Sequence, residues 1–349
     1  MESTREAYGK ALAFLGEHNK SLVVLDADLS KSTKSCEFAA RFPERFFNVG
    51  VAEQNLIGIA AGLASCGKVP FANTFAVFAS GRAYDQVRIL VAYSQANVKV
   101  VGTHAGILTG EDGPTHQATE DIALMRALPN MTVVQPADGV ETRLAVRAIA
   151  DHKGPVYFRL VRAKLADVFD SSYKFELGKG VIARDGDDVA IVATGAMLHI
   201  ALDAARLLES KKIAAAVINI HTIKPIDKSL LIKYAEKTGC MVCCEDHSII
   251  GGLGSAVAEV LAQEQEHLIP IGFIGIRDVF CESGKAEELY KLHGLTAEGI
   301  AGAGERVIER KGGGINGFWL LDRLLSQAKG CEDWQAASFN QDAAQQHLD

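Results

Sequence analysis

Short apolar runs that are typical of buried strands alternate along the first half of the chain with stretches of helical periodicity. Strands are predicted at residues 21–25, 46–49, 69–75, 98–102, 131–134 and 156–160. Helices are predicted between them at residues 3–17, 52–64, 80–93, 120–128 and 139–150, and Ser3 or Thr4 with Glu6 supplies a capping signal for the first. This alternation predicts a mainly parallel sheet that helices cover on both faces.

A second alternation follows a polar, weakly periodic connection. Its predicted strands are residues 189–193, 214–219, 240–244 and 269–274, and its predicted helices are 198–210, 228–237, 254–263, 286–292 and one from 296 onward. We therefore expect an α/β protein of two doubly wound, mainly parallel-sheet domains. The expected division is a first domain at 1–165, a linker at 166–187, a second domain at 188–328 and a disordered tail at 329–349.

Composition narrows the class of protein. The net charge of −7 argues against nucleic acid or an anionic membrane as the main partner, and no apolar run approaches the roughly 20 residues that span a bilayer. Seven scattered cysteines without a signal-like segment favour the reducing cytoplasm. Cys240 and Cys243 have the spacing of a redox motif, but they lie in a predicted strand, so we expect them to be buried and structural.

The stretch from residue 48 to residue 117 carries the candidate chemistry. Glu53 opens an apolar helix, where a shielded carboxylate can hydrogen-bond the aminopyrimidine ring of thiamine diphosphate and activate that cofactor. The alternative is an acidic residue that the helix dipole favours at this position. Phe75 and Phe78 lie three residues apart and can stack on a flat heteroaromatic ring, although such pairs are more often part of a core.

Asp112 and His116 flank a Gly-Pro turn, which can aim both side chains into one cavity. An imidazole there suits proton transfer to a sugar hydroxyl near neutral pH. The alternative is a histidine that only forms hydrogen bonds within its own loop. The polar loop at residues 26–32 follows a predicted strand, and ligands of parallel sheets bind at such strand ends.

Two further motifs favour structural interpretations. The glycine-rich run at residues 251–254 resembles a phosphate loop but lacks the full dinucleotide fingerprint, so a tight strand-to-helix turn is favoured. Glu245, Asp246 and His247 are adjacent, and adjacent residues rarely coordinate one ion. We expect hydrogen bonding or packing from these three, and we predict no metal ligands in this chain.

Taken together, four segments resemble the pyrimidine-binding domain of transketolase: residues 51–54 (Val-Ala-Glu-Gln), 74–78 (Thr-Phe-Ala-Val-Phe), 110–117 (Gly-Glu-Asp-Gly-Pro-Thr-His-Gln) and 129–131 (Pro-Asn-Met). The region after residue 188, with its Glu-Asp-His triplet and its glycine-rich run, is similar to the carboxy-terminal domain of that family. The resemblance covers residues 3 to 325, and residues 104–117 are its most specific part.

This resemblance implies a role for each matching residue. Glu53 would activate the cofactor, Phe75 and Phe78 would wall the pyrimidine ring, and Asp28 would lie near the thiazolium ring at a subunit interface.

The resemblance also assigns the sugar-binding side chains. His116 would contact the terminal hydroxyl of the donor, and Asp112 would read the hydroxyl next to the carbonyl. Four residues match the positions that bind the acceptor's phosphate in the family: Arg5, Ser32, His104 and Arg162. Their two guanidiniums, one hydroxyl and one imidazole can together satisfy the hydrogen-bonding capacity of the phosphate oxygens.

The sequence departs from the family in two places. The tyrosine that usually follows the second phenylalanine has no counterpart, because Gly81 and Arg82 stand there beside a one-residue insertion. The amino-terminal diphosphate domain is also absent, together with its Gly-Asp-Gly…Asn signature for Mg²⁺. The resemblance therefore implies the carboxy-terminal subunit of a split transketolase.

Such a subunit would work with a separate amino-terminal, diphosphate-binding subunit in an α₂β₂ assembly. That partner would hold most of the thiamine diphosphate and its Mg²⁺. The expected reaction moves a two-carbon ketol unit from a ketose phosphate to an aldose phosphate.

Three alternatives share this domain order. A deoxyxylulose-phosphate-synthase-like enzyme typically carries arginine where this chain has His104, and the run at residues 113–117 argues against a 2-oxo-acid dehydrogenase β-subunit. A non-catalytic assembly or regulatory protein on the same fold is the third. The intact set of Glu53, His104, Asp112 and His116 argues against it.

Overall fold

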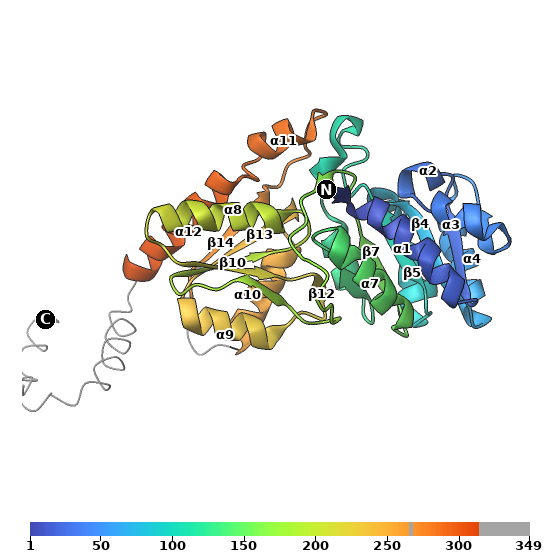
Figure 1. Ribbon diagram of the computed structural model, residues 1–349, viewed down its shortest axis with the longest axis horizontal. Coiled ribbons are helices and arrows are strands. Elements are labelled where there is room, and N and C mark those ends of the chain that lie inside the picture. The colour runs from blue at the N-terminus through green and yellow to red at the C-terminus, as the bar shows by residue number, and fades with distance from the viewer. Residues whose placement is uncertain (265–267, 314–349) are drawn as a thin grey trace, which may run out of the picture.

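The computed structural model describes residues 1–264 and 268–313. Two α/β halves lie side by side, and each has a central sheet between helices (Figure 1). The α/β architecture with two mainly parallel sheets confirms the predicted fold class. The tail expected at residues 329–349 lies outside the described residues. No described helix combines the length and the hydropathy needed to cross a membrane.

The first sheet has the strand order β12-β6-β7-β5-β4-β2-β3. Its strands are β2 (Leu22–Asp26), β3 (Phe46–Asn48), β4 (Val69–Phe75), β5 (Lys99–Thr103), β6 (Thr132–Val134), β7 (Val156–Arg159) and β12 (Thr222–Lys224). All neighbours pair in parallel except β12 and β6, which are antiparallel. The first six strands lie where the sequence predicted them. The sequence analysis did not predict β12, which reaches over from the second half of the chain.

Helices cover both faces of this sheet. One face packs against α1 (Thr4–His18), α3 (Cys36–Arg41) and α7 (Gly139–Asp151). The other face packs against α4 (Glu53–Ser65), η3 (Val87–Tyr93) and α6 (Asp121–Ala127). Shorter turns are α2 (Ser30–Thr33), η1 (Pro43–Arg45), α5 (Tyr84–Gln86) and η4 (Ile107–Asp112). The predicted cap of α1 is a capping box, in which Ser3 and Glu6 bond each other's backbone N–H groups.

The single helix predicted at residues 80–93 has a different form in the structure. A π-helical turn, η2 (Phe78–Arg82), is followed by the α-helical turn α5 and a second π-helical stretch, η3. A π-helix bonds residue i to i+5, so it absorbs one more residue per turn than an α-helix. The one-residue insertion noted in the sequence therefore lies in a widened helical turn.

The second sheet has the order β14-β13-β10-β11-β9. Its strands are β9 (Val181–Arg184), β10 (Val189–Ala193), β11 (Ala215–Asn219), β13 (Met241–Ser248) and β14 (Ile271–Ile276). Only β9 is antiparallel, and it arises within the segment expected to be a linker. A separate two-stranded ribbon joins β1 (Glu2–Ser3) to β8 (Lys164–Leu165).

Helices α8 (Met197–Ser210) and α12 (Ala297–Gly313) cover one face of the second sheet, while α9 (Lys228–Thr238) and α10 (Leu253–Glu264) cover the other (Figure 1). Helix α11 (Ala286–Leu292) precedes α12 in the chain and contacts η4 of the first half. Cys240 and Cys243 are buried in the two opposite cores of this sheet, which confirms that they are structural.

A buried ion pair stands between the two halves. Arg159 at the end of β7 donates to both carboxylate oxygens of Asp121, and both side chains are fully buried. Arg159 also donates to the backbone oxygen of Asp246 in β13, whose carboxylate accepts from the N–H of Ile107. Because the two bonds to Asp246 cross from one half to the other, they hold the second sheet against the loops that carry the site.

Candidate active site

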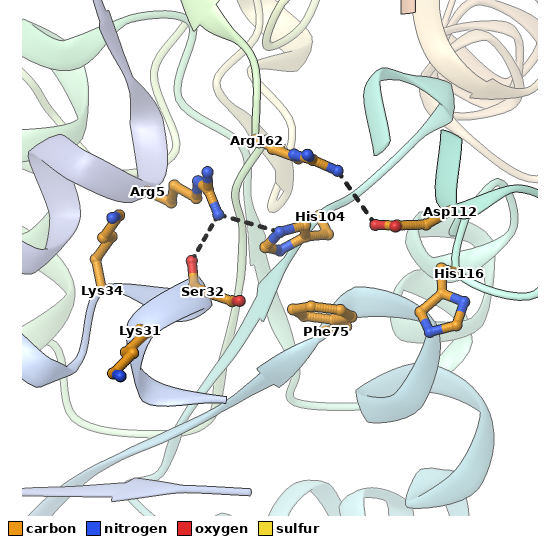
Figure 2. Close-up of a pocket in the computed structure, with 9 residues that line it drawn as sticks. All are labelled: Arg5, Lys31, Ser32, Lys34, Phe75, His104, Asp112, His116 and Arg162. Atoms are coloured by element: carbon orange, nitrogen blue, oxygen red, sulfur yellow. Dashed lines mark hydrogen bonds and ion pairs between the residues drawn. The ribbon is translucent and has the colours of Figure 1, made fainter. Parts of the chain in front are cut away.

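The carboxyl ends of β2, β4, β5 and β7 surround a cavity of about 450 Å³ (Figure 2). This is the edge where open parallel sheets bind ligands. The cavity is lined by Arg5, Lys31, Ser32, Lys34, Phe75, His104, Asp112, His116 and Arg162. The structure therefore brings together the four expected phosphate-site residues, both residues of the expected sugar-reading loop and one of the two phenylalanines.

Arg5 enters the cavity from the first turn of α1, which the capping box fixes in place. Its Nη1 donates to the backbone oxygen of Ser32 at 2.8 Å and lies 3.1 Å from His104 Nε2. Its buried Nε has no hydrogen-bond partner among the described residues. Burial, followed by the charge of Arg162, lowers the pKa of Arg5. A guanidinium with an unused donor beside a second guanidinium favours an anionic ligand.

His104 follows β5 with a positive φ of 57°, which is uncommon for a residue with a side chain. A guanidinium can only donate, so His104 Nε2 accepts from Arg5, and Nδ1 then carries the proton and donates to Thr103 Oγ1 at 2.9 Å. Burial, with the charges of Arg5, Arg162 and His116, lowers the pKa of His104 to about 3. The imidazole is therefore neutral near pH 7, and in this state it positions Arg5.

Asp112 and His116 lie at the opposite end of the cavity from Arg5 (Figure 2). Asp112 Oδ2 pairs with Arg162 Nη1 at 3.2 Å, and both side chains are partly exposed. His116 Nδ1 lies 2.9 Å from Thr115 Oγ1, and its ring packs edge-on at 5.4 Å from the ring of Phe78. The cavity thus has an acid and an imidazole at one end and the Arg5 guanidinium at the other, and Arg162 lies between them, paired with Asp112.

Two lysines that the sequence analysis did not single out lie at the Arg5 end of the cavity (Figure 2). Lys34 has a positive φ of 68° and packs its backbone against α1 at Gly9, where a Cβ would come within 2.6 Å of the Lys34 oxygen. Gly9 lies one turn after Arg5, so this contact sets Lys34 beside Arg5. Neither Lys31 nor Lys34 forms an ion pair within the described residues, and this end of the cavity is strongly positive.

Glu53 is the first residue of α4, and its side chain is only 1% exposed. Its Oε1 accepts from Arg82 Nη1 at 2.9 Å, and the Arg82 guanidinium carbon lies 4.3 Å from the centre of the Phe78 ring. Phe75 and Phe78 stack with ring centres 5.8 Å apart. Sequence reasoning missed Arg82 as a site residue, and its only signal was the one-residue insertion beside it.

Asp28 does not line the cavity. Its carboxylate accepts from Asn48 Nδ2 at 2.8 Å, and its φ is positive at 65°. The loop around it is shaped by the buried Asp26, whose carboxylate accepts from the hydroxyls of Thr33 and Ser35. This local network places Ser32 at the cavity and Asp28 outside it.

The glycine-rich run before α10 is a tight turn, as the sequence analysis favoured. The Glu245 carboxylate accepts from the N–H groups of Leu253 at 2.6 Å and Gly254 at 2.9 Å. A Cβ on Gly252 would lie 1.9 Å from Glu245 Oε2. Since a protein carboxylate already takes the helix N-terminus, it leaves no room for a phosphate. The described residues contain no group of three metal-binding side chains.

Comparison with known proteins agrees with this geometry. Residues 1–167 match the family model "Transketolase, pyrimidine binding domain", and residues 178–300 match "Transketolase, C-terminal domain". A protein of Methanocaldococcus jannaschii described as a transketolase C-terminal section is 51% identical over 309 residues, which cover 87% of this chain and 95% of the relative. The chain belongs to the transketolase family.

Other transketolases extend this relationship. A 6-deoxy-6-sulfo-D-fructose transketolase subunit of Clostridium is 43% identical, with 88% of this chain and 95% of the relative covered. Human transketolase is 39% identical, with 86% of this chain but only 48% of the human protein covered. A solved split-gene transketolase, described as an inactive β₄ tetramer, superposes with a TM-score of 0.84 at 52% identity, covering 89% of this chain and 100% of the other.

Transketolases generally use thiamine diphosphate with a divalent metal ion. The pyrimidine half of this cofactor fits the residues around Glu53, because a shielded carboxylate can bond a ring nitrogen while Phe78 offers a ring face for stacking. Arg82 covers both groups in this structure. The fit therefore requires the guanidinium to move aside.

Proposed function

We propose that this chain is the carboxy-terminal subunit of a two-chain, thiamine-diphosphate-dependent transketolase that moves a two-carbon ketol unit from a ketose phosphate to an aldose phosphate. The observation that carries the proposal is the shielded carboxylate of Glu53 beside Phe78, next to a cavity with an acid–imidazole end and a cationic end. The resemblance to both split and single-chain transketolases supports it.

When bound, the cofactor supplies the carbon centre that carries the two-carbon unit between sugars. Glu53 would hold the pyrimidine ring through a hydrogen bond to its carboxylate, in a buried site where such a bond is strong. Phe78, stacked on Phe75, would wall the ring and exclude water. Asp28 would act nearer the interface with the partner subunit, since its carboxylate lies outside the cavity.

The cavity residues would bind and orient the sugars. His116, which lines the cavity, would exchange a proton with a donor hydroxyl, and Asp112 would accept a hydrogen bond from the neighbouring hydroxyl. The sugar phosphate would lie toward the opposite end, where it would meet Arg5 and Ser32, while His104 orients Arg5. Arg162, which lies between the two ends and pairs with Asp112, would be the third side chain to contact the phosphate. This arrangement would set the direction in which a sugar phosphate lies in the cavity.

A separate amino-terminal, diphosphate-binding subunit would complete the site, with its Mg²⁺, in an α₂β₂ assembly. The chain spans about half of human transketolase, and the proposal assigns the role of the other half of that enzyme to this partner subunit. Helix α4, which begins with Glu53, has no charged residue after that glutamate, and its outer side exposes Ile59 and Gly62 beside the half-buried Gly58. An uncharged, partly apolar surface helix is typical of one that is covered by a partner.

Reconstitution tests this function. The two subunits are co-expressed, supplied with Mg²⁺ and thiamine diphosphate, and assayed with xylulose 5-phosphate as donor and aldose phosphates as acceptors. The proposal expects ketol transfer only when both subunits are present, and Glu53→Ala should abolish turnover while the subunits still co-purify. Near-normal activity of that variant, or turnover by the isolated chain, contradicts the proposal. Sulfonated sugars form a second substrate arm, because the Clostridium relative is named for one.

A further inference from the structure

Arg82 is the last residue of the π-helical turn η2. It lies four residues after Phe78, a spacing that puts both side chains on the same side of the turn, and its guanidinium lies over the ring of Phe78. The same side chain reaches across to α4 and donates to Glu53 at 2.9 Å. One guanidinium thus contacts both groups that the proposed pyrimidine site requires.

The two partners of this ion pair differ in freedom. The Glu53 side chain is 1% exposed, whereas that of Arg82 is 50% exposed. Arg82 is the one hydrogen-bond partner that the described residues give to the Glu53 carboxylate. A buried carboxylate needs a partner, so Glu53 stays fixed and paired while Arg82 has solvent on its other side.

Space for the arginine to move lies beside it. A Cβ built on the preceding Gly81 meets no atom within 4 Å, so the protein leaves open room at this turn. Arginine also has a long, unbranched stem that can place its charge in water. The guanidinium can therefore leave Glu53 without a change in the backbone of α4.

The pyrimidine ring and the Arg82 guanidinium compete for the same two contacts. Both need the Glu53 carboxylate as an acceptor, and both need the open face of Phe78. They cannot occupy these positions together. A protonated ring nitrogen that replaces the guanidinium keeps the buried carboxylate hydrogen-bonded.

We propose that Arg82 is a gate on the pyrimidine site, which closes over Glu53 and Phe78 when the site is empty and swings into solvent when the cofactor binds. The inference rests on the proposed function and deepens it by assigning a role to a residue of that site. Closed, the gate keeps the carboxylate paired in a subunit that lacks cofactor. Open, it leaves Glu53 free to hold the pyrimidine ring.

The gate is tested by whether Arg82→Ala raises or lowers the dissociation constant of thiamine diphosphate. Thiamine diphosphate is titrated with Mg²⁺ into the assembled two-subunit protein by calorimetry, and its association rate is measured by stopped flow. Removal of a competing contact should tighten binding, so Arg82→Ala should lower the dissociation constant about tenfold, chiefly through faster association. Arg82→Gln, which keeps a donor but loses the charge and the stacking plane, should lower it about threefold.

Arg88 supplies the matched control. It is an exposed arginine of η3 for which the described residues form no ion pair, so Arg88→Ala should leave cofactor binding unchanged. Weaker cofactor binding by Arg82→Ala would overturn the gate, because the arginine would then hold the cofactor. Unchanged binding would overturn it as well, because the contact would then be incidental.

A second measurement separates this inference from the proposed function. The pyrimidine half of the cofactor, 4-amino-5-hydroxymethyl-2-methylpyrimidine, is titrated into the isolated chain and followed by NMR, with circular dichroism as the check on folding. Arg82→Ala should bind this probe more tightly than the unchanged chain. Equal or weaker binding by the variant contradicts the gate alone. Failure of the unchanged two-subunit protein to bind thiamine diphosphate contradicts the proposed function instead.

Discussion

Glu53 and Glu245 are both buried glutamates whose side chains lie near the start of an apolar helix, yet their carboxylates have different kinds of partner. Glu53 begins α4 and accepts from one half-exposed side chain, that of Arg82. Glu245 lies in β13 and accepts from two backbone N–H groups at the start of α10. A side chain can exchange places with a ligand, whereas the backbone of a helix cannot. The comparison therefore separates a carboxylate that is available for chemistry from one that holds the fold together.

The largest expected effect is on turnover at Glu53. Glu53→Gln keeps the size of the side chain but removes the negative acceptor, so turnover of the two-subunit enzyme should fall about 10³-fold. The free energy of unfolding should change by less than about 1 kcal/mol, because the amide can still bond its neighbours. Steady-state kinetics and urea unfolding of the same preparation check both expectations. A large loss of stability in this variant would make Glu53 resemble Glu245 and break the comparison.

Glu245 should show the converse pattern. Glu245→Ala leaves the buried N–H groups of Leu253 and Gly254 without an acceptor. The free energy of unfolding should fall by about 3 kcal/mol. Urea unfolding followed by circular dichroism measures this loss. Variant protein that still folds should keep a near-normal Michaelis constant, since Glu245 does not line the cavity.

Substitutions at two glycines test the contrast between the starts of α10 and α4 through their effects on the free energy of unfolding. Gly252→Ala places a Cβ against the Glu245 carboxylate and should lower the free energy of unfolding by about 2 kcal/mol. Gly58→Ala on α4 meets nothing within 4 Å, so the isolated chain should gain about 0.5–1 kcal/mol from helix propensity. Thermal unfolding of the isolated chain compares the two variants. If the outer face of α4 is the interface, Gly58→Ala should also weaken co-purification with the partner subunit.

A third buried glutamate, Glu141, makes the free energy of unfolding depend on pH. Glu141 bonds the hydroxyl of Tyr173 and the amide of Asn219, and burial raises its pKa from 4.5 to about 7. Between these pH values the folded chain binds more protons than the unfolded chain. This group therefore makes the free energy of unfolding fall as the pH rises from 4.5 to 7, by up to about 1.4 kcal/mol per unit. Urea unfolding at pH 5, 6 and 7 should show that Glu141→Gln reduces the slope.

The smallest expected effect concerns the cationic end of the cavity. Lys34→Ala removes one ammonium beside Arg5 and should raise the Michaelis constant for a sugar phosphate about threefold, with a weaker effect at high salt. Lys20→Ala is the matched control, because this exposed lysine lies outside the cavity lining. Equal kinetic effects of the two substitutions would mean that Lys34 acts only through the general charge of the protein.

Local patterns in the sequence predicted much of this protein. Alternating apolar runs and helical periodicity gave the α/β fold and placed most strands within one or two residues, because buried strands and amphipathic helices leave their own period in the chain. The resemblance to transketolase supplied the candidate roles of Glu53 and the cavity residues. The short strands β9 and β12 escaped prediction, since each is defined by pairing with a distant strand.

Only the tertiary structure decided which groups meet in the candidate site. The sequence contained the insertion near Gly81, but the contact between Arg82 and Glu53 exists only because η2 packs beside α4 in the folded chain. Likewise, Lys34 reaches the cavity because Gly9 has no side chain. The backbone at Lys34, which is distant from Gly9 in sequence, can therefore approach the backbone of α1 closely. Such contacts join residues with no shared local period, so the geometry of packing determines them.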